Sequence, residues 1–96
     1  MILNERRTEE GLLVAVCDRD VLGETFENGE VSLTVTEEFY GGEAVEEQRV
    51  VESLADADVA NLVGTDVVDL AVEEGFVDEA QVLDLDGTQH AQFLRL

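Results

Sequence analysis

Apolar and polar positions along the chain predict a buried strand and then a hairpin in its first third. Residues Gly11–Cys17 are continuously apolar, as in a strand that is buried on both faces. Asn28-Gly29 lies between two β-prone runs and is typical of a two-residue hairpin turn. Such a turn would pair Phe26 with Val31 and would place both side chains toward the core.

A second hairpin is predicted near the C-terminal end of the sequence. Asp86-Gly87 separates two β-prone runs and again favours a two-residue turn. This turn would set Leu83 opposite His90 and Leu85 opposite Thr88. His90 would therefore share the core-side face of the hairpin with the two leucines.

Between the hairpins, the spacing of apolar residues favours helices. Ala44–Asp56 carries apolar side chains at helical spacing and polar side chains on the other side. Residues 58–64 form a short apolar bridge, for which we expect one helical turn. Thr65 is a favourable N-cap for a second helix, Asp66–Glu74, and Gly75 is a natural C-terminal stop.

The order of these elements, strands followed by two helices and then strands, predicts an α+β fold. We expect a mostly antiparallel sheet of four or five strands with both helices on one face. The length of 96 residues suits a single domain that spans residues 1–96. Residues 1–10 are expected to form a loosely ordered N-terminal segment.

The charge of the chain is strongly one-sided. It has 24 Asp and Glu residues against five arginines and no lysine, a formal net charge of −19. A protein that grips nucleic acid over a broad basic face is therefore excluded. Molar salt shortens the Debye length to about 3 Å and removes self-repulsion, so this surface is typical of a halophile's cytosolic protein. The alternative is a protein that binds polycations, although the acids are spread along the whole chain.

Apolar runs and cysteine usage bear on location and cofactors. The longest apolar run, Leu12–Cys17, is far shorter than the ~18 residues that a membrane span needs. We therefore expect a cytoplasmic protein without membrane contact. One cysteine allows no internal disulfide and no cysteine-rich zinc site, and we expect neither a metal nor a cofactor.

Five short motifs occur in a characteristic order between about Leu12 and Phe93: Cys17-Asp18, Leu22-Gly23, Phe39-Tyr40-Gly41-Gly42, Ala60-Asn61-Leu62-Val63-Gly64 and His90-Ala91-Gln92. The pattern resembles the archaeal family known as domain of unknown function 424. The resemblance implies an archaeal cytosolic protein, and the acidic surface implies a haloarchaeal one. It implies no catalytic residue. Relatives often have a basic residue at the position of Glu24, so the acid here weakens the case for a phosphate-bearing partner.

One candidate site combines Cys17 with His90. A thiolate at the end of a strand, with a histidine base nearby, would be a nucleophile, and Asp18 follows the cysteine directly. However, free cysteines are among the most buried residues, and a lone histidine on a half-buried strand is more often a hydrogen-bonded structural residue. A metal site built from the same three residues lacks motif spacing.

A second group of candidate residues is suited to binding. Tyr40 precedes Gly41-Gly42, where bare backbone would offer hydrogen-bond donors and the ring would stack on a base. Asn61 stands in an apolar segment, where an amide contacts a partner or caps a helix. His90, the only histidine, completes the set. In the competing interpretation, residues 39–42 are a strand-to-helix corner and the glycines serve only the turn.

We therefore expect a small non-enzymatic binding module, associated with translation or another RNA-containing assembly, whose partner is a protein or a ribonucleoprotein. The alternative is a small hydrolase or transferase with Cys17 as nucleophile and His90 as base. A sulfur-to-imidazole separation above about 6 Å, or a Cys17 sealed in the core, would speak against the enzyme. An exposed patch around Tyr40 or Asn61 that differs from the acidic remainder of the surface would favour the binding module.

Overall fold

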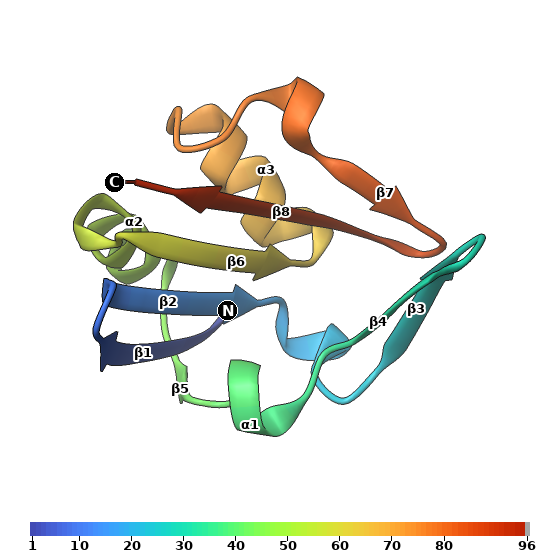
Figure 1. Ribbon diagram of the computed structural model, residues 1–96, viewed down its shortest axis with the longest axis horizontal. Helices are drawn as coiled ribbons and strands as arrows, with labels where there is room; N and C mark the ends of the chain where they lie inside the picture. The colour runs from blue at the N-terminus through green and yellow to red at the C-terminus, as the bar shows by residue number, and fades with distance from the viewer. Residues whose placement is uncertain (96) are drawn as a thin grey trace.

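The computed structural model describes residues 1–95 and has a six-stranded mixed sheet at its centre (Figure 1). The spatial order is β5 (Glu43–Ala44), β1 (Ile2–Thr8), β2 (Gly11–Cys17), β6 (Val59–Val63), β8 (Thr88–Leu94) and β7 (Leu83–Leu85). Strands β2 and β6 run parallel, whereas the other neighbouring pairs are antiparallel. Strands β3 (Thr25–Asn28) and β4 (Val31–Thr34) form a separate two-stranded sheet.

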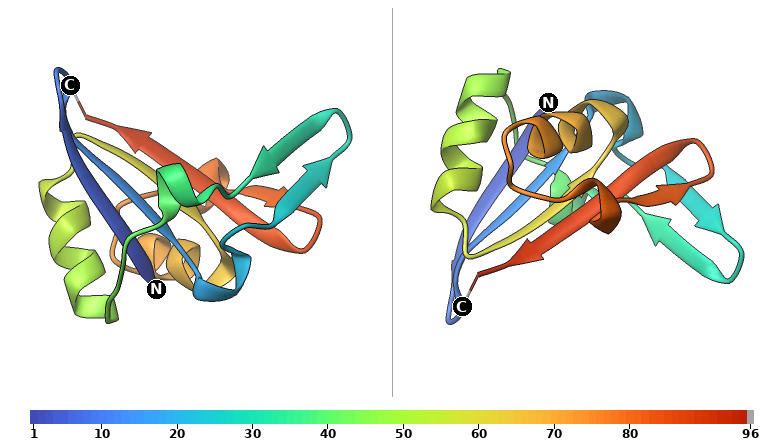
Figure 2. Two further views of the ribbon diagram at one scale, coloured as in Figure 1. Left: turned by 90° about the horizontal axis from the view of Figure 1, so that it is seen from below. Right: turned by 90° about the horizontal axis from the view of Figure 1, so that it is seen from above.

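The helices lie on both sides of the large sheet (Figure 2). Helices α2 (Glu47–Asp56) and α3 (Thr65–Glu73) cover one face, and the main core of buried residues fills the space between them and the strands. The short helix α1 (Glu37–Tyr40) and hairpin β3–β4 lie on the other face, over a smaller apolar cluster that includes Cys17 and Val63. No helix within residues 1–95 is long and apolar enough to cross a membrane.

The α+β class agrees with the sequence, but the predicted architecture is wrong. The sheet has six strands and one parallel pair, and the helices are interleaved with strands along the chain. The main error concerns Val59–Val63, which form strand β6 and not a helical turn. Five apolar residues are too few for periodicity to separate a strand from a helix, so pairing with β2 and β8 decides the outcome.

The N-terminal segment also differs from the expectation. Residues 1–10 were expected to be loosely ordered, yet Ile2–Thr8 pair along their whole length with β2. Beyond β1 the sheet continues only with the two residues of β5, so most of β1 is an edge strand. Charged side chains are common on edge strands, which explains why this strand has a weak apolar signal.

The ends of the two long helices were predicted with different success. Helix α2 begins at Glu47 and not at Ala44, because Glu43–Ala44 pair with β1 as strand β5. Helix α3 ends as predicted before Gly75. The Gly75 N–H donates to the Val72 carbonyl, and the Phe76 N–H donates to the Ala71 carbonyl.

The two hairpins show the same contrast. The C-terminal hairpin is confirmed, with Leu83 opposite His90 and Leu85 opposite Thr88, although Leu83 is 40% exposed and does not lie in the core. In the first hairpin, Phe26 faces Leu33 and not Val31. The two turn residues are 29 and 30, which puts glycine in the first turn position, as type II′ turns prefer. Val31 is consequently 52% exposed.

Candidate functional site

The sheet register places Cys17 and His90 in one row but not in contact. Cys17 lies opposite Val63, and Val63 lies opposite His90. The Cα atoms of Cys17 and His90 are therefore two strand spacings apart, a total of about 9–10 Å. The Cys17 side chain is 0% exposed. Burial, aided by the charge of Asp18, raises the pKa of the thiol to about 11. A sealed thiol with little thiolate is a poor nucleophile, so the geometry argues against the Cys17–His90 enzyme.

Asp18 has a structural role that the sequence did not indicate. Its two carboxylate oxygens accept hydrogen bonds from the backbone N–H groups of Asp66 (2.9 Å) and Val67 (3.0 Å). Asp18 therefore caps helix α3 from the end of β2, in place of the predicted cap at Thr65. Burial raises the pKa of this carboxyl, while the two N–H donors act in the opposite direction.

Tyr40, Gly41 and Gly42 form a packing corner. The Tyr40 ring is buried, so it is not available to stack on a base. Burial also raises the pKa of its hydroxyl to about 12. A Cβ at Gly42 would collide with the backbone carbonyl of Leu3. The second glycine therefore lets the chain pass close to strand β1, which agrees with the structural interpretation of residues 39–42.

Asn61 and His90 are half-buried sequence candidates on the large sheet. Both lie on the face of the sheet that α2 and α3 leave uncovered, and Asn61 is directly opposite Gln92. The side-chain amides of Asn61 and Gln92 make no hydrogen bond within residues 1–95. The His90 Nδ1–H donates to the Leu62 carbonyl (2.9 Å), which leaves Nε2 without a partner among the described residues. These polar groups are therefore available to a partner.

An apolar row borders this polar row. Leu13 on β2 lies opposite Val59 on β6, and Val59 lies opposite Leu94 on β8. Leu94 is 60% exposed, and the other two side chains are half-buried. We define the open face as the surface made by six residues: Leu13, Val59, Asn61, His90, Gln92 and Leu94.

The open face differs from the rest of the surface in charge. None of its six residues is an acid, and neither is any other described residue of β1, β2, β6 or β8 whose side chain points to this side of the sheet. The whole chain, by contrast, has 24 acids in 96 residues. A surface around Asn61 that differs from the acidic remainder is the feature that the binding hypothesis required.

Arg6 and Asn4 on β1 close one side of the open face. The Arg6 guanidinium donates to the carbonyls of Glu38 (2.6 Å) and Phe39 (3.3 Å) and lies over the Phe39 ring at 5.3 Å. Asn4 donates to the Gly41 carbonyl at 2.5 Å. Both side chains therefore hold the end of helix α1 against the sheet, and Arg6 is engaged by carbonyl groups rather than offered to a phosphate.

The sequence did not single out Leu13, Val59, Gln92 and Leu94. The predicted last strand, residues 89–95, carries no acid, but this does not mark one face, because the residues of both faces lack acids. The neighbouring rows stayed hidden because Val59–Val63 were not recognised as a strand. Without β6, nothing joins the β2 and β8 residues into one surface.

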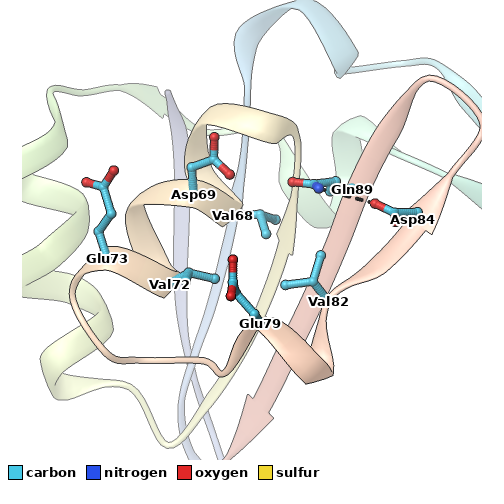
Figure 3. A pocket seen from close by; sticks show the side chains of 8 residues that line it. All are labelled: Val68, Asp69, Val72, Glu73, Glu79, Val82, Asp84 and Gln89. Carbon is cyan, nitrogen blue, oxygen red and sulfur yellow. Dashed lines mark hydrogen bonds between the residues drawn. The ribbon is translucent and has the colours of Figure 1, made fainter.

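The other side of the sheet has an open cavity of about 300 Å³ between α3 and the segment that leads through β7 (Figure 3). Its apolar part is made by three valines, Val68, Val72 and Val82. Its polar lining includes four acids and a glutamine: Asp69, Glu73, Glu79, Asp84 and Gln89. None of the sequence candidates lies there, and residues 1–95 contain no group of three or more His, Cys, Asp or Glu side chains that could hold a metal ion.

Comparison with known proteins places the chain in a family. Its structure is similar to the crystal structure of an uncharacterized conserved protein from Methanopyrus kandleri, with a TM-score of 0.79 and 25% sequence identity over 99% of this chain and 92% of that chain. A search of curated proteins finds no match. The family model described as "Protein of unknown function (DUF424)" matches residues 5–96. Because this match spans nearly the entire sequence, the protein belongs to the DUF424 family.

Proposed function

We propose that the protein is a small non-enzymatic binding module of a halophilic archaeal cytosol and that it contacts its partner through the open face. The observation that supports this most strongly is the absence of acids from the described residues of that face, in a chain of net charge −19. The buried centres of protein interfaces are depleted of charged residues. An acid-free surface on so acidic a chain therefore fits a contact that excludes water.

The exposure of apolar side chains supports the same proposal. Leu94 is 60% exposed, and it continues the row of Leu13 and Val59 across three strands. Contiguous exposed apolar surface is unfavourable in water unless a partner covers it. The row is therefore best explained as part of an interface.

We propose that this partner is a protein within an RNA-containing assembly such as the translation apparatus. The small size of the chain and its resemblance to an archaeal family favour a role as an accessory component. The few cations favour contact with a protein component, because neutralising phosphates requires several Lys or Arg side chains. The enzyme alternative is not retained, because Cys17 is fully buried and its pKa is raised.

The test is capture of partners from an extract of a halophilic archaeon in about 2 M KCl, where long-range charge effects are screened. Wild-type protein is compared with Gln92→Glu on the open face and with Gln48→Glu, an exposed position at the start of α2. Both variants make the same chemical change. We expect the wild type and Gln48→Glu to retain the same partner and Gln92→Glu to lose it. Equal recovery by the two variants, or no specific recovery at all, would contradict the proposal.

A further inference from the structure

Strands β2 and β6, the parallel pair, are covered completely on one face and incompletely on the other. On the side of α2 and α3, their residues Val14, Ala60 and Leu62 are each 0% exposed. On the other side, Leu13, Val59 and Asn61 remain partly exposed. Parallel strands in proteins are usually buried on both faces, commonly by helices. The open face is therefore the part of this sheet that is buried by helices on one side only.

Building on the proposed function, we infer that the open face binds one amphipathic helix of a partner protein. The three strands β2, β6 and β8 span two strand spacings, about 9–10 Å, which matches the diameter of about 10 Å of a single helix. Helix α1 and its anchor Arg6 limit the surface on the β1 side. The available width therefore suits one helix lying on the sheet.

The chemistry of the surface defines the side chains of that helix. The row of Leu13, Val59 and Leu94 requires an apolar stripe, because burying these groups against polar atoms would leave those atoms without hydrogen bonds. The amides of Asn61 and Gln92 both donate and accept, so they pair with neutral polar side chains at the edge of the stripe. An uncharged, mainly apolar contact stripe follows from this composition.

Charge around the open face defines the flanks of the helix. Exposed acids lie on two elements next to it: Glu37 and Glu38 on α1, and Glu9 and Glu10 in the turn between β1 and β2. Acidic flanks on the partner would bring like charges into direct contact with these acids, whereas lysine or arginine flanks would form close ion pairs, the range that molar salt screens least. The occupant is therefore a helix with an apolar stripe flanked by basic side chains.

An RNA strand fits the same surface less well. Single-stranded nucleic acid is held by cations along its backbone and by aromatic rings on which bases stack. The open face has no aromatic residue other than the imidazole of His90, and the nearby Arg6 donates to two backbone carbonyls. The surface thus lacks both groups that RNA requires.

The experiment is an NMR titration of the isotope-labelled full chain in about 2 M KCl, which suppresses unspecific attraction between basic peptides and an acidic protein. The first probe is a leucine–lysine peptide of about 18 residues with leucine at helical spacing. The second has the same composition in scrambled order and therefore the same charge. The third is a short oligouridylate.

We expect the amphipathic peptide to shift resonances of the open face and α1, and to bind about tenfold more tightly than its scrambled form. Leu94→Glu should weaken binding about tenfold, whereas Val31→Glu, at a similarly exposed apolar residue on β4, should change it less than about twofold.

Absent binding, equal binding of both peptides, equal effects of the two variants, or shifts centred on the cavity beside α3 would overturn the inference. Shifts of the open face by oligouridylate alone would also overturn it; they would leave a binding role of the open face standing but would contradict the protein partner. Failure of the function itself is seen separately, in the capture experiment.

Discussion

Asn61 on β6 and Gln92 on β8 lie directly opposite each other in the sheet, on the side that α2 and α3 do not cover. Neither side-chain amide hydrogen-bonds another group within residues 1–95. Gln92 is exposed and Asn61 is half-buried, so a partner can reach both amides. We therefore expect substitutions at this pair to weaken partner binding without lowering the free energy of unfolding.

Gln92→Glu is expected to leave the stability of the protein nearly unchanged. The side chain is exposed and unbonded, and surface substitutions of this kind usually alter the free energy of unfolding by less than about 0.5 kcal/mol. Urea unfolding in molar KCl, with Gln48→Glu as the control, measures this. A loss more than about 1 kcal/mol larger for Gln92→Glu than for the control would mean that the amide has a structural role.

Asp18→Ala is expected to destabilise the protein by about 1–2 kcal/mol, because it removes the cap of helix α3. Asp18→Asn keeps one carbonyl oxygen and should cost less. Asp20→Ala, an exposed acid two residues later, is the matched control and should be nearly neutral. Chemical unfolding of the three variants gives the comparison. Equal stability of Asp18→Ala and Asp20→Ala would show that the cap contributes nothing.

Alkaline pH is expected to destabilise the fold through Cys17. The pKa of its thiol is about 11 in the folded protein against an ordinary value of 9.0. As pH rises from 9 toward 11, the unfolded chain loses a proton that the folded chain keeps. Stability from this group is therefore intact below pH 9 and falls by about 2–3 kcal/mol through that interval.

Unfolding free energies measured across this alkaline range test the assignment. Cys17→Ala should flatten the decrease between pH 9 and 11. The pKa of Tyr40 is raised from 10.0 to about 12, so Tyr40→Phe should flatten a later decrease in the same direction. If both variants follow the wild-type curve, the alkaline loss has another origin.

The elements that the sequence predicted well are those encoded by neighbouring residues. The second hairpin was correct in register because Asp86-Gly87 and the alternation around it are local signals. The end of helix α3 at Gly75 is equally local. In contrast, β6 and the Asp18 cap depend on partners that lie far away along the chain, and no local pattern encodes them.

The candidate site was predicted in part for the same reason. Asn61 and His90 were singled out as unusual polar residues within apolar segments, and both belong to the open face. Tyr40 and Gly42 were equally unusual, yet they serve the packing of α1 against β1. Assigning Leu13, Val59 and Leu94 to a shared surface requires the register of β2, β6 and β8, which only the folded chain provides.

The protein is expected to lose its structure well below about 1 M KCl. A net charge of −19 on a chain of 10.5 kDa is strongly self-repulsive, and the repulsion is screened only when the Debye length falls to a few ångströms. Far-UV circular dichroism across a KCl series measures the transition. A chain that is fully folded in dilute buffer would contradict the adaptation to high salt, and its carboxylates would then be candidates for the working surface.

The most direct test of the open face is site-specific photo-crosslinking inside a halophilic archaeon, with a photoreactive residue at position 92 or, as control, at position 48. We expect a discrete protein adduct from position 92 and none from position 48. Adducts from position 48 without any from position 92 would place the contact elsewhere on the protein and would contradict the account.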